Sequence, residues 1–172
     1  MEHDKMKGVK IDGTPSAEEL HASPGFPQES IRKGPLAFIE CVEEIPCNPC
    51  ATACPRGAIT LEGGLTALPR LDAELCTGCG LCISVCPGLA IYVKAREHEP
   101  GFSSILFPYE YYPLPQKGDP VECVNRFGKS ICSGTVLSVR TAEKLDRTAL
   151  IKVSFPQAYF DEVISIKRLP NQ

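Results

Sequence analysis

Short apolar and β-branched runs fill the last third of the chain, where turn residues separate them. The runs are PVECV, SICSGTVLSV, TALIKVSF and EVISIKRL, which predict four or five strands, with a single helical turn in SFPQAYFDEV. So many strands in about 55 residues favour a small barrel over an open sheet. The linking segment NRFGK predicts a tight hairpin around Gly128, with Cys123 opposite Cys132 and Val124 facing Ile131.

The first 36 residues contain too many prolines and glycines for a long regular element. One short helix is expected, because Ser16 and Glu19 have the spacing of a capping box. Composition alone leaves a disordered tail and an ordered arm equally open. Spaced apolar residues favour an arm that lies along the body or on a partner. These residues are Ile11, Leu20, Phe26 and Ile31.

Between this arm and the strand-rich end, the chain contains an internal repeat. AFIECVEEIPCNPCATACPRGAITLE and PRLDAELCTGCGLCISVCPGLAIYVK align on a C-x2-C-x3-C-P core and on the Ala-Ile that follows it. Each copy predicts a strand, a cysteine loop, a helical turn and an apolar strand. Two such units related by pseudo-twofold symmetry predict a small sandwich.

The second copy carries four cysteines in the order C-x2-C-x2-C-x3-C-P, the spacing that bacterial ferredoxins use for iron-sulfur clusters. Thiolates are soft ligands that select iron-sulfur clusters or zinc. Zinc would need two separated C-x2-C pairs, so a cluster is favoured. The cysteines of this motif are Cys76, Cys79, Cys82 and Cys86, followed by Pro87.

The first copy departs from this pattern, because Glu44 stands where the first cysteine normally falls and Cys41 lies three residues upstream. In ferredoxins with two clusters, the fourth cysteine of each run binds the cluster of the other run. This rule predicts one cluster on Cys76, Cys79, Cys82 and Cys54, and a second on Cys41, Cys47, Cys50 and Cys86. The alternative is that Cys41 is a buried small hydrophobic residue, with a three-iron cluster or a water ligand at the other site.

The remaining side chains show no active site. The sequence has neither a G-x-G-x-x-G motif after a strand nor a P-loop, so neither a dinucleotide nor a P-loop nucleotide is expected. Because the titratable groups assemble no active site, the chain is not expected to be an enzyme on its own. A disulfide between Cys123 and Cys132 is sterically conceivable, but free thiols are favoured, and we assign these two cysteines no chemistry.

Composition and charge limit the cellular location and the kinds of partner that are expected. Ten cysteines without an apolar signal segment after Met1 favour a reducing, cytoplasmic location. No apolar stretch reaches 18 residues, so no membrane insertion is expected. The net charge is −3 and neither half is strongly basic, which makes nucleic acid an unexpected partner.

These features predict an α+β protein: a ferredoxin-like dicluster domain, an extended N-terminal arm and a small all-β, barrel-like C-terminal domain. The expected boundaries are 1–36 for the arm, 37–100 for the dicluster domain, 101–120 for a Pro-rich linker and 121–172 for the barrel.

Residues 37–95 resemble the dicluster bacterial ferredoxins. More narrowly, GPLAFIECVEEIPCNPCATACPRGAI, CTGCGLCISVCPGLAI and PLPQKGDPVECVNRFGKSICSGTVLSV resemble the small iron-sulfur subunits of multi-subunit flavin-dependent amine and amino-acid dehydrogenases. These include the proline, hydroxyproline and sarcosine-like complexes. The resemblance implies two 4Fe-4S clusters that relay single electrons from or between flavin subunits. It also implies a hetero-oligomer in which FAD or FMN is bound by the partners only.

Two other functions stay open at this point. One is a free-standing ferredoxin electron carrier. The other is an iron-sulfur sensor whose barrel binds a ligand or nucleic acid, which the absence of a basic stripe makes the weaker alternative.

Overall fold

The computed structural model describes residues 8–27, 34–141, 143–145 and 147–170. Its helices are short: α1 (Val9–Asp12), α2 (Ala17–Ala22), α3 (Pro49–Thr52), α4 (Leu81–Ser84), and the 3-10 turns η1 (Glu143–Leu145) and η2 (Gln157–Tyr159). The strands are β1 (Leu36–Ile39), β2 (Ile59–Leu61), β3 (Pro69–Leu71), β4 (Ile91–Glu99), β5 (Phe102–Tyr109), β6 (Pro120–Val124), β7 (Ser130–Arg140), β8 (Ala149–Pro156) and β9 (Ser165–Ile166). Over the described ranges, no helix has the length and apolar character that crossing a membrane requires.

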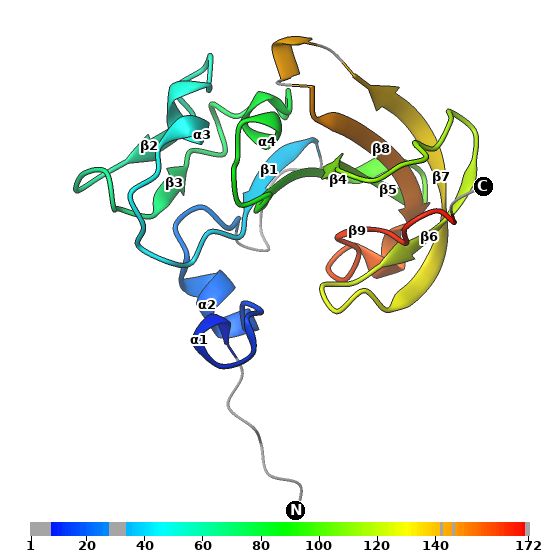
Figure 1. Cartoon of the computed structure of the whole chain (residues 1–172), viewed down its shortest axis with the longest axis horizontal. Coiled ribbons are helices and arrows are strands. Elements are labelled where there is room, and N and C mark those ends of the chain that lie inside the picture. Colours follow the sequence, from blue (N-terminus) through cyan, green and yellow to red (C-terminus); the bar gives the residue numbers. More distant parts are fainter. Residues whose placement is uncertain (1–7, 28–33, 142, 146, 171–172) are drawn as a thin grey trace, which may run out of the picture.

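Antiparallel pairing joins most of the chain into a single curved sheet. Its seven strands follow the order β1-β4-β5-β8-β7-β6-β9, while β2 and β3 form a separate two-stranded ribbon. Figure 1 shows the cysteine-bearing segments around α3 and α4 on one side, the curved sheet on the other, and β1 and β4 between them. The first copy of the repeat contains β1, α3 and β2 and the second contains β3, α4 and β4, so the β1–β4 and β2–β3 pairs each join one strand of one copy to one strand of the other.

Strand β4 contributes side chains to two hydrophobic cores. Ile91 and Val93 belong to the apolar cluster that contains cysteines of both loops. Tyr92 belongs to the second cluster, inside the curve of the sheet. Because successive side chains of a strand point to opposite faces, one strand supplies a wall to each core.

The described part of the N-terminal arm lies along the body, as its apolar residues predicted. Ser16 and Glu19 form the expected capping box of α2, with the Glu19 amide donating to Ser16 Oγ at 3.1 Å. The arm then crosses two strands: the amide of Leu71 donates to Pro24 O and that of Ile39 donates to Gly25 O. Ile31, the last of the predicted apolar contacts, lies outside the described residues.

The structure differs from the expected linker and barrel. Residues 102–109 form strand β5, which pairs with β4 through the turn at Pro100-Gly101 and with β8 along its whole length. The prolines predicted to keep 101–120 irregular or extended permit a strand because Pro108 is the only proline among these strand residues. The C-terminal strands therefore continue the sheet begun by β1 and β4, and this sheet ends at β1 and β9 within the described residues.

The predicted hairpin is present between β6 and β7. Gly128 adopts a φ of 71°, its amide donates to Asn125 O, and Cys123 pairs with Cys132. The expectation that Val124 faces Ile131 is wrong, because the register shifts after the cysteine pair and Val124 pairs with Ser130. An irregularity of this kind places one extra residue on one strand and cannot be counted from the turn.

Phenylalanines on two paired strands offer a matched test of where the core lies. Phe155 on β8 is fully buried, whereas Phe102 on β5 is 45% exposed. We expect Phe155→Ala to lower the free energy of unfolding by about 3–5 kcal/mol, because a large buried side chain leaves a cavity. Phe102→Ala should cost less than about 1 kcal/mol. Urea unfolding followed by far-ultraviolet circular dichroism measures both, and equal losses would contradict this placement of the core.

Candidate metal centre

Two loops of the same design position the predicted ligands. Each ends in a Cys-Pro pair, and the amide four residues later donates back to the cysteine sulfur: Ala58 to Cys54 Sγ at 3.3 Å, and Ala90 to Cys86 Sγ at 3.4 Å. The helical turns α3 and α4 precede these ends and lie against each other. Hydrogen bonds of this kind favour the thiolate and, on a cluster, raise the reduction potential.

Four of the predicted ligands line one small, almost wholly apolar cavity. They are Cys54 from the first loop and Cys76, Cys79 and Cys82 from the second. The backbone closes tightly around this cavity at two left-handed glycines. A Cβ on Gly78 would lie 2.6 Å from Pro35 Cβ, and one on Gly80 would lie 2.7 Å from Leu106 Cδ2. Larger residues are excluded at both positions, so the loop is held close to the space enclosed by the thiols.

The other four predicted ligands also interact with one another. Burial, followed by the thiolates of Cys86 and Cys47, raises the pKa of Cys41. Burial and the same two neighbours, together with Cys41, raise the pKa of Cys50 to about 11. Cys41 thus lies close enough to Cys47, Cys50 and Cys86 to interact with them electrostatically, and their binding of one cluster stays a prediction. Glu44, at the usual ligand position, is exposed in the loop.

The chemistry of the two thiol sets fits iron-sulfur clusters. Burial, followed by the thiolates of Cys76 and Cys79, raises the pKa of Cys82 to about 12. Thiols in such surroundings ionise when a cationic centre offsets burial and mutual repulsion. Among the described residues, no three His, Cys, Asp or Glu side chains are grouped for a single metal ion. A 4Fe-4S cluster is a different arrangement, held by four thiolates around a polynuclear core.

The remaining cysteine pair lies apart from both sets. Cys123 and Cys132 are free thiols that face each other across β6 and β7. Burial and the neighbouring Cys132 thiol raise the pKa of Cys123 to about 12. Both side chains pack in the apolar cluster inside the curved sheet, and the cysteines of the loops pack in the other cluster.

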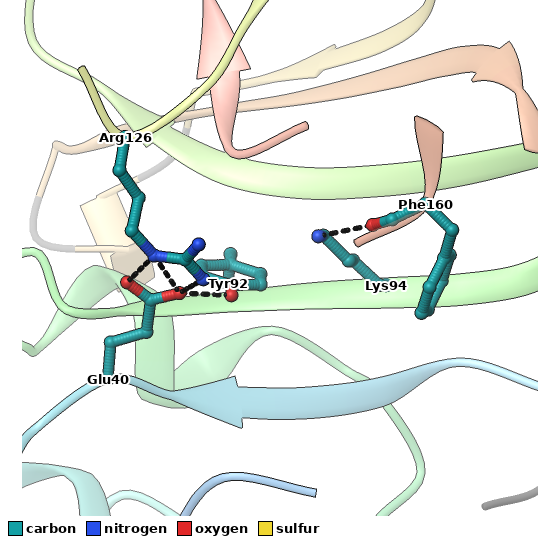
Figure 2. A network of polar contacts seen from close by, with 5 residues as sticks. All are labelled: Glu40, Tyr92, Lys94, Arg126 and Phe160. Atoms are coloured by element: carbon teal, nitrogen blue, oxygen red, sulfur yellow. Dashed lines mark hydrogen bonds and ion pairs between the residues drawn. The ribbon is translucent and has the colours of Figure 1, made fainter. Parts of the chain in front are cut away.

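A partly buried ionic network beside Cys41 was not predicted from the sequence. The carboxylate of Glu40, the residue before Cys41, accepts hydrogen bonds from the Tyr92 hydroxyl and from Arg126 in the β6–β7 turn (Figure 2). Arg126 Nε lies 3.0 Å from Glu40 Oε2. Glu40 and Arg126 are 86 residues apart, so no local pattern could have paired them.

Comparison with known proteins agrees with the second motif. Residues 69–92 match the family model of the 4Fe-4S binding domain. An isethionate sulfite-lyase activating enzyme of Desulfovibrio desulfuricans is 44% identical over 59 residues, which cover 33% of this chain and 18% of that protein. An uncharacterized ferredoxin of Methanocaldococcus jannaschii is 44% identical over 48 residues, 28% of this chain and 30% of that protein. One component of an ion-translocating oxidoreductase complex of Methanosarcina acetivorans is 40% identical over 50 residues, 29% of this chain and 18% of that protein.

These similarities are local. The chain spans less than a third of the length of each of these relatives. No solved structure gives a significant match. The motif, the cavity and the comparisons together indicate an iron-sulfur protein. More particularly, residues 69–92 form a ferredoxin-type 4Fe-4S domain, which supports a role in electron transfer.

The network of Glu40 and Arg126 yields a stability prediction. Arg126→Met should lower the free energy of unfolding by about 2 kcal/mol, because it leaves a partly buried carboxylate without its cation. The double variant Glu40→Gln with Arg126→Met should recover part of that loss. Arg70→Met provides the control: its ion pair with Glu62 is 3.3 Å long and more than half exposed, so about 0–1 kcal/mol is expected. Urea unfolding that shows equal losses for Arg126→Met and Arg70→Met would contradict the assignment.

Proposed function

We propose that this chain is the electron-transfer subunit of a flavin-dependent amine or amino-acid dehydrogenase complex and carries two 4Fe-4S clusters. The observation that supports the proposal is that Cys54 of the first loop lines one cavity with Cys76, Cys79 and Cys82, while Cys86 of the second loop acts on the pKa values of both Cys41 and Cys50. One cluster is assigned to Cys54, Cys76, Cys79 and Cys82, and the other to Cys41, Cys47, Cys50 and Cys86. The identity of the partners rests on the sequence resemblance.

The chain's own residues would hold, tune and expose the clusters. Iron-sulfur clusters accept and release single electrons, which suits a partner flavin that receives two electrons at once. Ala58 and Ala90 donate to ligand sulfurs, and the apolar walls around the thiols exclude water. Cys79 is exposed, which places one edge of its site at the surface.

A surface beside Cys41 suits a partner. The loop between Cys41 and Cys47 is exposed from Glu43 to Pro46, and its Ile45 is 50% exposed. Leu65, whose carbonyl accepts the Cys47 amide, is 54% exposed. Two apolar side chains next to the acidic pair Glu43 and Glu44 offer both apolar contact and charge complementarity.

A free-standing ferredoxin remains the second candidate, but the contacts of the sheet disfavour it. Leu106 of β5 and Leu150 of β8 pack in the same cluster as the ligand cysteines. A carrier with a dispensable tail would have no need of residues beyond β4 in its cysteine core. This packing of Leu106 and Leu150 against cysteines supports a role for the C-terminal strands in the proposed cluster-binding unit.

The ligand assignment predicts a selective loss of iron. Cys41→Ser should lower the iron per chain by roughly one atom if a three-iron cluster forms, and by about four if the whole cluster is lost. Cys123→Ser, which changes a buried thiol outside both sets, should leave the iron content unchanged. Iron analysis with electron paramagnetic resonance of the reduced protein distinguishes these cases. Unchanged iron and spectra in Cys41→Ser would defeat the assignment.

The partnership predicts a specific complex. A tagged full-length chain expressed in its native host should co-purify with a flavin-containing protein, and an amine or amino acid should reduce the clusters of that complex. Charge reversal at Glu43 and Glu44 to lysine should weaken retention of the flavoprotein at least tenfold. Glu18→Lys on the exposed face of α2 is the matched control and should leave retention of the flavoprotein unchanged. A stable monomer that reduces freely diffusing electron acceptors without any partner would contradict the proposal.

A further inference from the structure

An open cavity lies away from both thiol sets. It has a volume of about 450 Å³, and the described residues that line it come from the N-terminal arm, β1, β4, the β6–β7 turn and the segment after η2. Its position on β4 follows from strand alternation: Ile91 and Val93 face the cysteine core, whereas Lys94 and Arg96 line the cavity. The cavity is thus separated from the candidate iron-sulfur side by a single strand.

Lys94 presents a buried cation to this cavity. The residue is 3% exposed, and its Nζ donates to the carbonyl oxygen of Phe160 at 2.6 Å (Figure 2). An ammonium group has three donors, so this single carbonyl leaves capacity for two more hydrogen bonds. No ion pair joins Lys94 to a carboxylate of the described residues within 4.0 Å.

The other cations of the cavity already have carboxylate partners. Arg126 is paired with Glu40, and Arg96 lies 3.5 Å from Asp161 at the exposed rim. A negatively charged group that enters the cavity would therefore be attracted to Lys94, the lining cation that has no carboxylate partner among the described residues. Burial of a charge is tolerated when an opposite charge and further hydrogen bonds accompany it, which is what such a group would supply.

The walls around Lys94 are aromatic. Its Nζ lies 5.7 Å from the ring centre of Phe38, 5.1 Å from that of Tyr92 and 5.2 Å from that of Phe160. Phe26 meets Phe38 edge to face at 5.5 Å and extends the wall toward the arm. Apolar, aromatic walls with one fixed charge are typical of small-molecule sites, and the volume lies in their usual range of about 300–1,000 Å³.

We propose that this cavity binds a small aromatic carboxylate, with the carboxylate at Lys94 and the ring packed against the edge-to-face pair of Phe38 and Phe160. The carboxylate would accept the remaining hydrogen bonds of the buried Lys94 ammonium, and the ring would pack against aromatic side chains of the cavity wall. This site is independent of the thiol sets and of the electron-transfer partner.

Protonation of Lys94 gives the site a pH signature. Burial and the charges of Arg126 and Arg96, offset in part by Glu40 and Asp161, lower the pKa of Lys94 to about 7. Below this pKa the ammonium form is present and binds the carboxylate. Above it, binding must draw a proton from solvent, so affinity should fall as the pH rises. Lys94→Met removes this group and should bind the ligand with no such fall.

The test uses the full-length, cluster-loaded protein and isothermal titration calorimetry with 2-naphthoate. The neutral alcohol of the same shape, 2-naphthalenemethanol, serves as the ligand control. We expect saturable binding of the carboxylate at least tenfold tighter than that of the alcohol at pH 6, and a weaker preference at pH 8.5. This comparison needs no variant, so it stands even if a substitution impairs folding.

Variants locate the site. Lys94→Met should reduce 2-naphthoate affinity at least tenfold and leave alcohol binding nearly unchanged, with iron content as the check that the protein is folded. Lys152→Met is the control, since Lys152 lies on β8 outside the cavity and should bind as the unaltered protein does. Absence of saturable binding at millimolar ligand, equal affinity for acid and alcohol, or full affinity in Lys94→Met would each overturn the proposal.

Discussion

The alternation of side chains along β4 is the constraint on which both halves of the molecule depend. Ile91 and Val93 complete the core that holds the cysteine loops, while Tyr92 and Lys94 face the interior of the curved sheet. A strand period of two fixes these opposite assignments together, because a slip of one residue would exchange the two faces. The cysteine loops therefore cannot be placed without also placing the C-terminal strands.

The two cysteine loops are built alike but are supported unequally. Cys76, Cys79 and Cys82 sit within seven residues, where left-handed Gly78 and Gly80 fold the backbone tightly around them. The first loop has no equivalent glycines before its α3 turn. A longer segment, exposed from Glu43 to Pro46, separates Cys41 from Cys47. Its cysteines are held in place by contacts from elsewhere, such as the Leu65 carbonyl that accepts the Cys47 amide.

Features set by neighbouring residues could be predicted from the sequence, and features set by distant pairing could not. The capping box at Ser16, the hairpin at Gly128 and the cysteine repeat depend on spacings of a few residues, and the structure contains all three. The shift that pairs Val124 with Ser130 is a property of the folded ladder. The prolines of residues 101–120 obscured strand β5, which contains only Pro108, and the cavity at Lys94 requires an arm, a turn and two strands that no sequence pattern brings together.

Long-range support also gives a physical account of the displaced cysteine. In the second motif the ligand spacing alone keeps the thiols close, so the local sequence must be compact. Cys41 instead follows the end of β1, where Glu40 is fixed by Arg126 and Tyr92 and where the Cys41 carbonyl accepts the Ser23 hydroxyl at 3.1 Å. A residue positioned by a strand, a partly buried ion pair and the arm does not need a short loop to reach its neighbours. The five intervening residues are then free to form the exposed acidic segment, so the irregular spacing and the surface beside it have one structural cause.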